Sequence, residues 1–233
     1  MRVLFNADDF GLTKGITDGI MESHINGVVG SATLMMNGHA VDYTVALAKK
    51  HPALKVGIHL VLTWGKPLSD DVPDLVDDNG LFKYKNTFRE MDPPNVEQVE
   101  KEWRAQIDAF LETGLALHHI DSHHHVHGWE PLRELVVKLA KDYGVPVRYV
   151  ETLKENHEIL LADALWLDFY GDGVNADIFT ELQQLSVDSV EVMTHPAIID
   201  DELRQVSSYV EKREEERKIL CGMPVPRWVE LCR

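Results

Sequence analysis

Short apolar runs alternate with segments of helical periodicity along most of the chain, and this alternation constrains the fold more than any other feature. The runs that read as strands are RVLFN at 2–6, VVGSATLMM at 28–36, KVGIHLVL at 55–62, LHHIDSH at 117–123, VPVRYV at 145–150, LWLDFYG at 165–171 and SVEVMTH at 189–195. Apolar residues at helical spacing predict helices at 16–26, 41–51, 95–113, 131–144 and 200–220. Strand–helix repeats of this kind build a largely parallel sheet.

Repetition of this unit in one continuous chain predicts an α/β fold, and specifically a distorted or incomplete (β/α) barrel of the TIM type. A length of 233 residues and a hydrophobic content of 44% suit one domain that spans residues 1–233. A doubly wound open sheet is the alternative. The barrel carries a specific expectation, because its functional side chains gather where the carboxyl ends of the strands meet.

Two segments depart from the repeat. Residues 63–95 contain four prolines and an acidic cluster, and they predict a loop insertion, which is a lid, a binding loop or a disordered excursion. The highly charged segment 200–220 predicts a solvated helix that packs through Leu203, Val206 and Ile219, with Tyr209 or Val210 between them.

The charge balance limits the partners. With 23 Lys plus Arg against 39 Asp plus Glu, the net charge of -16 repels nucleic acid and anionic membrane surfaces. No stretch approaches the roughly 20 apolar residues of a membrane span. Cys221 and Cys232 are too widely spaced for a redox or zinc-ribbon pair. These features indicate a reduced, cytoplasmic enzyme, for which a homodimer is the commonest assembly.

Polar residues stand where buried strands should end. Asp8 and Asp9 close the first strand, His59 lies in the third, His123 closes the fourth and His195 closes the last. Each side chain costs several kcal/mol to bury without a partner, so one shared site explains them better than separate accidents. Taken singly, the aspartates also suit a helix cap or a solvated turn, and His59 also suits a hydrogen-bonded core histidine.

The segment HHIDSHHHVH at 118–127 concentrates histidine around Asp121. Alternation along a strand puts His119, Asp121 and His123 on one face, a spacing that suits one metal ligand and a carboxylate that orients an imidazole. Two imidazoles and one carboxylate favour a divalent transition ion such as zinc and leave positions open for water and substrate. We assign His123 to the metal and His118, His119 and His124 to structural roles.

The motifs NADDFGLTKG, GIHLVLTWGKPL, IDSHHHVH, DFYG and EVMTHPA occur in an order and spacing that resemble the YdjC-like carbohydrate deacetylases, which include the chitooligosaccharide (diacetylchitobiose) deacetylases. The resemblance implies a barrel related to that of polysaccharide deacetylases, and an enzyme that removes acetyl groups from N-acetylated sugars. It implies Asp9, His59 and His123 as ligands of one divalent metal, usually magnesium in this family. Asp8 matches the catalytic base and His195 the acid.

A metal-dependent N-deacetylase acting on an N-acetylated oligosaccharide is therefore the predicted function. The side chains predicted to contact the sugar are Trp64, His125, His127, Trp129 and Tyr170. For the aromatic residues among them, ordinary packing is the competing interpretation. A metal-dependent phosphoesterase is one rival, although Lys14 and Lys66 are the only basic residues near the motifs. A non-catalytic, metal-dependent sugar-binding protein is the other.

Overall fold

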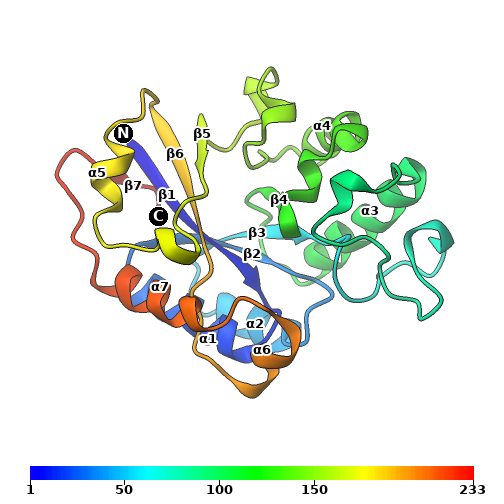
Figure 1. The fold of residues 1–233 in the computed structure, drawn as a ribbon, viewed down its shortest axis with the longest axis horizontal. Helices are drawn as coiled ribbons and strands as arrows, with labels where there is room; N and C mark the ends of the chain where they lie inside the picture. Colours follow the sequence, from blue (N-terminus) through cyan, green and yellow to red (C-terminus); the bar gives the residue numbers. More distant parts are fainter.

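The computed structural model describes residues 1–233 and contains a curled parallel sheet with helices on its outer side (Figure 1). The strands are β1 (Arg2–Phe10), β2 (Val29–Leu34), β3 (Lys55–Leu60), β4 (Ile120–Ser122), β5 (Ala164–Trp166), β6 (Ser189–Thr194) and β7 (Glu230–Leu231). Their order is β4-β3-β2-β1-β6-β5, and β7 pairs with the start of β1. Every paired strand is parallel to its neighbour.

The strand order identifies an incomplete barrel. β1 lies between β2 and β6, as it does when a strand–helix series closes on itself, and the doubly wound open sheet is therefore wrong. The ring is not complete, because β4 and β5 do not pair with each other. Between them the chain contributes only the single-residue parallel bridges Ile120–Val147 and Val147–Leu160. The sheet is thus a half-barrel.

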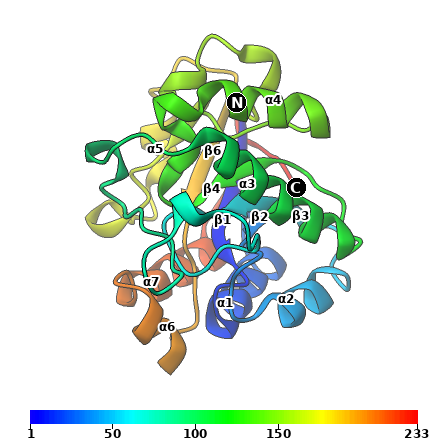
Figure 2. The same cartoon turned by 90° about the vertical axis from the view of Figure 1, so that its right-hand side faces the viewer.

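The helices are α1 (Lys14–Ile25), α2 (Val41–Ala48), α3 (Val96–Glu112), α4 (Arg133–Tyr143), α5 (Ile178–Leu182), α6 (Asp201–Val206) and α7 (Glu211–Gly222). Local sequence explains several of their ends. The Thr13 hydroxyl accepts the N–H of Ile16 and begins α1, and Gly144, with a φ of 67°, ends α4 in the left-handed conformation that glycine adopts easily. Figure 2 shows α1, α2 and α7 together toward one end of the molecule, α4 at the other end and α3 between them.

The sheet is buried on both faces, as a parallel sheet covered by helices requires. Every residue of β2 and β6, and every residue of β1 after Arg2, is buried. The continuous core contains 53 buried residues, and each large apolar side chain in it contributes about 1.5–3 kcal/mol relative to exposure. No helix combines the length and the apolar character that a membrane crossing needs.

Several sequence predictions need correction, among them the strand predicted at 117–123, which contains only Ile120–Ser122. Residues 145–150 do not form a strand, because Pro146 cannot donate to a ladder and only Val147 forms bridges. The strand predicted at 165–171 is shorter and ends at Trp166. The helix predicted at 200–220 is two helices, with a break after Val206.

The segment 200–220 is also less solvated than its composition indicates. Leu203, Val210 and Leu220 are buried, whereas Val206 and Ile219 are only partly buried. Arg213 and Glu216, two charged residues of α7, are buried as well. Helix α7 therefore faces the protein interior with charged side chains.

The segment at 63–95 contains no α-helix or strand, only two short 3-10 turns, Pro73–Leu75 and Phe88–Glu90. It is nevertheless attached to the core through buried Leu75, Phe82 and Phe88. The Glu102 carboxylate accepts the N–H groups of Leu68 and Ser69, which attaches the beginning of the segment to α3.

Candidate active site

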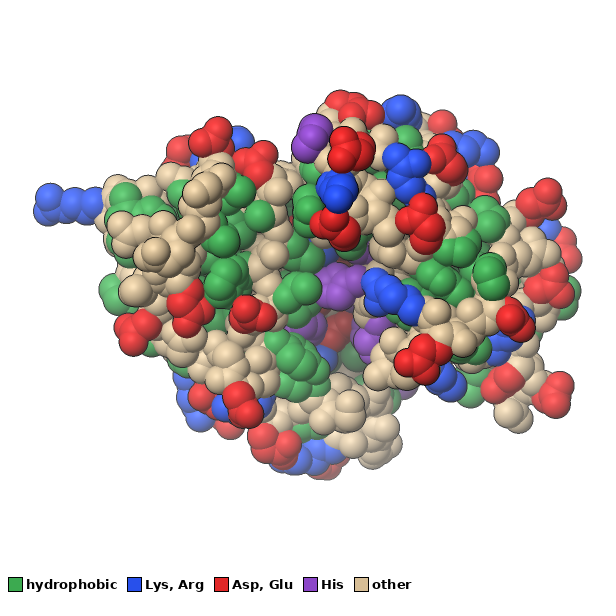
Figure 3. Space-filling model, turned by 45° about the horizontal axis from the view of Figure 1, so that its top comes forward, with side chains coloured by type: hydrophobic (Ala, Val, Ile, Leu, Met, Phe, Trp, Pro, Cys, Tyr) green, Lys and Arg blue, Asp and Glu red, His purple; other side chains and the backbone are tan.

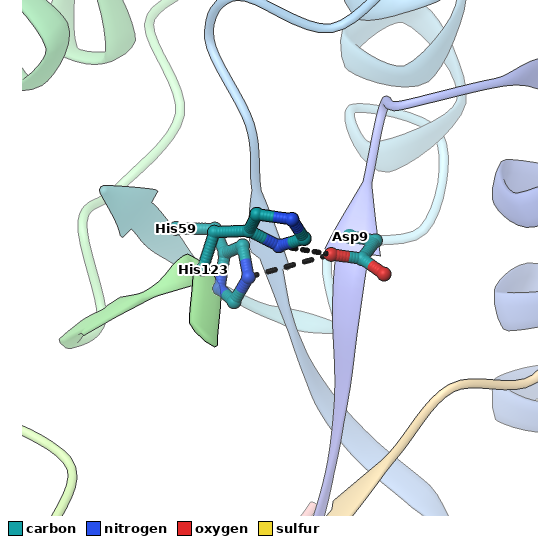
Figure 4. Close-up of side chains that lie close together, drawn as sticks. All are labelled: Asp9, His59 and His123. Atoms are coloured by element: carbon teal, nitrogen blue, oxygen red, sulfur yellow. Dashed lines mark hydrogen bonds and ion pairs between the residues drawn. The ribbon is translucent and has the colours of Figure 1, made fainter. Parts of the chain in front are cut away.

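Asp9, His59 and His123 come together at the carboxyl ends of β1, β3 and β4 (Figure 4). Asp9 Oδ1 lies 3.4 Å from His59 Nε2 and 3.0 Å from His123 Nδ1. One potential ligand atom from each residue lies within 4.8 Å of the other two. The convergence predicted from the strand ends is therefore confirmed.

The His59 imidazole is oriented by its neighbour in the sheet. His59 pairs with Asp121 across β3 and β4, and its Nδ1 lies 2.7 Å from Asp121 Oδ1. This contact turns Nε2 toward Asp9, where it is buried and forms no hydrogen bond. A buried ring nitrogen without a partner is costly, and a cation bound between Nε2, Asp9 and His123 would satisfy it. The donor set fits a divalent metal.

The backbone at Asp9 is left-handed, with a φ of 65°, which costs a non-glycine residue roughly 1–3 kcal/mol. The register of β1 against β2 shifts here, between Ala7 and Phe10. As a result Asp8 and Asp9 both line one cavity, although consecutive carboxylates on an extended strand would point to opposite faces. Arg213 Nη2 lies 2.5 Å from Asp9 Oδ2, which leaves Oδ1 for the imidazoles.

Asp8 is held by Arg148, a residue fully buried beneath the site. Arg148 Nη1 donates to Asp8 Oδ2 at 2.7 Å and Nη2 donates to Oδ1 at 2.6 Å, while Asn6 donates a third hydrogen bond to Oδ1. Burial alone would raise the pKa of Asp8, but the Arg148 guanidinium outweighs burial and holds that pKa below its usual value. Asp8 is therefore ionised at neutral pH.

Arg148 also contacts Asp121 at 2.9 Å and Glu191 at 2.8 Å, so three carboxyl groups surround one guanidinium. Burial raises the pKa of Glu191 to about 7, although the attraction of Arg148 acts in the opposite direction. Near neutral pH, partial protonation of Glu191 reduces the excess negative charge around the buried cation.

His195 follows β6 beside Asp8, because Ala7 of β1 pairs with Thr194. Its Nε2 lies 4.0 Å from Asp8 Oδ2. Burial, assisted by the positive charge of Arg213, lowers the pKa of His195 to about 4. The free protein therefore holds a neutral imidazole at pH 7, and not the imidazolium that an acid needs at the start of a reaction.

These residues line a cavity of about 530 Å³. Figure 3 shows the hollow, with histidine side chains at its base and hydrophobic side chains beside it. The cavity wall includes the predicted site residues Asp8, Asp9, His59, Trp64, His123, His125, Tyr170 and His195. It also includes His124, for which we expected a structural role only.

Trp129 and His127, which we expected to contact the sugar, do not line this cavity. Trp129 is 5% exposed and packs against Tyr84 and Phe88, with ring centroids 5.6 and 5.2 Å away. His127 is fully buried, and its Nδ1 lies 2.5 Å from Ser122 Oγ. Ordinary packing therefore accounts for Trp129, and an internal hydrogen bond accounts for His127.

Four residues of the site are not among the site residues that the sequence predicts: Arg148, Tyr209, Arg213 and Glu216. Arg148 could have been found, because a charge within the apolar run VPVRYV is the same signal that marks His59. The others lie in a polar segment that gives no such signal. The sequence placed only Lys14 and Lys66 near the motifs as basic residues, and this is wrong for the folded protein. Arg148 and Arg213 also lie at the site, although each is already paired with a carboxylate.

Known proteins resemble the whole chain. A carbohydrate deacetylase of Oceanobacillus iheyensis is 56% identical over 99% of this chain and 100% of its own, and a carbohydrate deacetylase of Brevibacillus brevis is 43% identical over 98% and 94%. A solved structure from Enterococcus faecalis, described as a cellobiose-phosphate cleavage protein, superposes with a TM-score of 0.87 at 34% identity and covers 94% of this chain and 90% of its own. The model of the YdjC-like protein family matches residues 2–231. With this match and these identities, the chain belongs to the YdjC-like family.

Proposed function

We propose that this protein is a metal-dependent hydrolase that removes the acetyl group from an N-acetylated sugar, with N-acetylglucosamine oligosaccharides such as diacetylchitobiose as substrates. The observation that carries the proposal is the convergence of Asp9, His59 and His123 in one cavity with Asp8 and His195. The carbohydrate deacetylase relatives support it independently. We also propose that the half-barrel is related to that of the polysaccharide deacetylases.

Asp9, His59 and His123 would hold the metal. When bound, a divalent ion polarises a carbonyl oxygen and makes a water molecule a stronger nucleophile near neutral pH. The two imidazoles favour zinc or another transition ion, whereas the family resemblance implies magnesium. Titration of the metal-free protein with each ion distinguishes the two.

Asp8 and His195 would carry out the proton transfers that hydrolysis requires. Hydrolysis forms a bond between the water oxygen and the acetyl carbon and breaks the bond between that carbon and the amide nitrogen. The nitrogen must gain a proton to leave as an amine. Because Asp8 is ionised and His195 is neutral, neither holds this proton at the start. Asp8 would accept the proton from water, and His195, 4.0 Å away, would pass it to the amine.

The cavity suits a sugar longer than one residue. A second cavity of about 640 Å³ adjoins the first, and Thr63, Trp64 and Lys85 line both. Trp64 and Tyr170 offer ring faces to sugar rings, and His125 offers a polar contact. An extended oligosaccharide would place its acetamide at the metal and its next residue beyond Trp64.

A metal-dependent phosphoesterase is the second candidate. The observation that brings it in is the description of the Enterococcus neighbour as a cellobiose-phosphate cleavage protein, which names a phosphorylated disaccharide without naming the bond that is cleaved. A metal-dependent sugar-binding protein without activity is the third. The test incubates the purified protein with N-acetylated chitooligosaccharides, and separately with a phosphorylated disaccharide, in the presence of magnesium or zinc. Acetate release supports the proposal, phosphate release supports the second candidate, and binding without either product supports the third.

A further inference from the structure

Tyr209 connects three segments that are distant in sequence. It lies in the turn between α6 and α7, and its hydroxyl donates to Glu216 Oε1 at 2.6 Å. The same hydroxyl accepts the N–H of Gly171 at 3.0 Å. Glu216 Oε2 in turn accepts the N–H of His195 at 2.5 Å. One phenol and one carboxyl group thus join the loop after β5, the end of β6 and helix α7.

The ring of Tyr209 forms part of the cavity wall. It stacks on Tyr170, with centroids 4.1 Å apart and an interplanar angle of 17°. Both rings meet the His195 imidazole edge-on, at 5.4 Å for Tyr170 and 5.8 Å for Tyr209. Tyr170 is 45% exposed, so the stacked pair presents an aromatic face beside His195.

The loop that carries Tyr170 has few other attachments. Phe169 is fully buried and anchors one side of it. Within residues 168–173, the bond from Gly171 to Tyr209 is the hydrogen bond that reaches a distant part of the chain. The others are local: Gly173 bonds to Tyr170 and Asn175, and Val174 bonds to Gly171. Gly171 has a φ of 58°, a conformation that glycine adopts easily and that turns the loop here.

Tyr209 itself is held firmly. Its N–H donates to Ser207 Oγ at 3.1 Å, and its carbonyl accepts Arg213 Nε at 2.8 Å. A fixed side chain with a satisfied hydroxyl serves better as a support for a neighbouring loop than as a donor of protons.

We propose that Tyr209 is a positioning residue for sugar binding, an inference that rests on the proposed deacetylase function. Its hydroxyl, oriented by Glu216, holds the Gly171 loop so that Tyr170 presents its ring beside His195. The Tyr209 hydroxyl bonds to Gly171 and Glu216 and to none of Asp9, His59 and His123, so its contribution is separate from metal binding. Tyr209 is linked to Asp9 through its backbone carbonyl and Arg213, and replacement of the side chain by Phe keeps that carbonyl.

The variant Tyr209→Phe keeps the stacked ring and removes the hydroxyl. The variant loses both hydrogen bonds of the hydroxyl, to Glu216 and from Gly171. Loss of the one that holds the Gly171 loop corresponds to about 3- to 10-fold in the equilibrium between the held and the released loop. We therefore expect KM and the dissociation constant for the oligosaccharide to rise by about that factor, with kcat changed by about twofold or less. The affinity for zinc, measured by calorimetry, stays unchanged. Hydrogen exchange at the Gly171 amide accelerates by about the same 3- to 10-fold factor.

Two further variants separate this role from a general loss of structure. Tyr43→Phe is the matched control, because it removes a similar tyrosine–carboxylate bond, of 2.6 Å to Asp18, on the exposed surface of α2. Glu216→Gln keeps an acceptor oxygen for only one of its two donors, so it raises KM as well. The part of its effect that passes through Tyr209 does not add to that of Tyr209→Phe, because both act through the same link, whereas the bond from Glu216 to His195 is separate.

Unchanged oligosaccharide affinity and unchanged Gly171 exchange in Tyr209→Phe would overturn the inference, as would a lowered zinc affinity. If the wild-type protein releases no acetate with any ion, the proposed function fails instead. Calorimetric binding of the oligosaccharide and the exchange at Gly171 still decide the role of Tyr209 in that case.

Discussion

Arg148 binds both carboxylate oxygens of Asp8, at 2.6 and 2.7 Å, across 140 residues of sequence. The same guanidinium contacts Asp121, which orients His59. The proposed base and a proposed metal ligand therefore depend on one buried cation.

Replacement of Arg148 by Gln should destabilise the protein by about 3–5 kcal/mol, because Asp8, Asp121 and Glu191 would remain buried without their cation. Denaturant titration measures this loss. Lys138→Gln, which removes an exposed ion pair with Glu100, should leave the midpoint unchanged. Equal stability of the Arg148 variant and the wild type would contradict the proposed dependence on this cation.

Asp8→Asn should keep the metal and lose about 100- to 10,000-fold in kcat, because the amide cannot accept a proton from water. Acetate release measures activity, and calorimetry measures metal affinity in the same preparation. The circular dichroism spectrum checks that the variant still folds, because it removes one of the three carboxyl groups that pair with Arg148. Full turnover in this variant would remove Asp8 from the role of base.

Metal uptake should release about one proton at pH 7–8. Burial lowers the pKa of His59, but Asp121 and the neighbouring carboxylates outweigh burial and raise that pKa to about 10. Below that pH the imidazole carries a proton that metal must displace, so affinity should increase about tenfold per pH unit on approach to pH 10. Calorimetry in buffers of different ionisation enthalpy measures the number of protons released on metal binding. A number near zero at pH 7.5 would argue against ligation by His59.

Arg213→Gln should weaken metal binding about 10- to 100-fold, because Asp9 loses the contact that directs Oδ1 toward the imidazoles. Removal of a positive charge acts in the opposite direction, so Arg213→Lys, which keeps the charge without the guanidinium, separates the two effects. Arg217→Gln, one turn along α7, removes a bond to Glu22 and should leave metal affinity unchanged. Tighter binding in Arg213→Gln would mean that charge repulsion dominates orientation.

Two tryptophans of the sequence prediction should behave differently. Trp129→Ala should lower stability by about 3–5 kcal/mol, because the ring fills the core against Tyr84 and Phe88. Trp64→Ala should weaken oligosaccharide binding with little change in Tm, because this ring lines both cavities and is only partly buried. If Trp64→Ala lowered stability and Trp129→Ala weakened oligosaccharide binding, the roles assigned to the two residues would be wrong.

The sequence could predict the parts of the site that local pattern determines. Asp9, His59 and His123 were identifiable because polar side chains at the ends of parallel strands share one edge of the sheet. Helical periodicity detects burial through apolar residues alone, so it could not show that Arg213 and Glu216 face inward. The contact between Arg213 and Asp9 spans 204 residues, and no local pattern encodes it. The strand wrongly predicted at 145–150 contains Pro146 and Arg148, and both residue types are unfavourable inside a buried strand.

The gap between β4 and β5 has a consequence for how the molecule holds its shape. Where a closed ring would have two further strands, only Val147 and Leu160 form bridges, and Arg148 follows Val147 directly. From this seam the guanidinium reaches carboxylates on β1, β4 and β6. These ion pairs therefore connect the strands on both sides of the gap from inside the barrel. A substitution that removes the charge of Arg148 should lower the stability of the fold as well as disturb the proposed base.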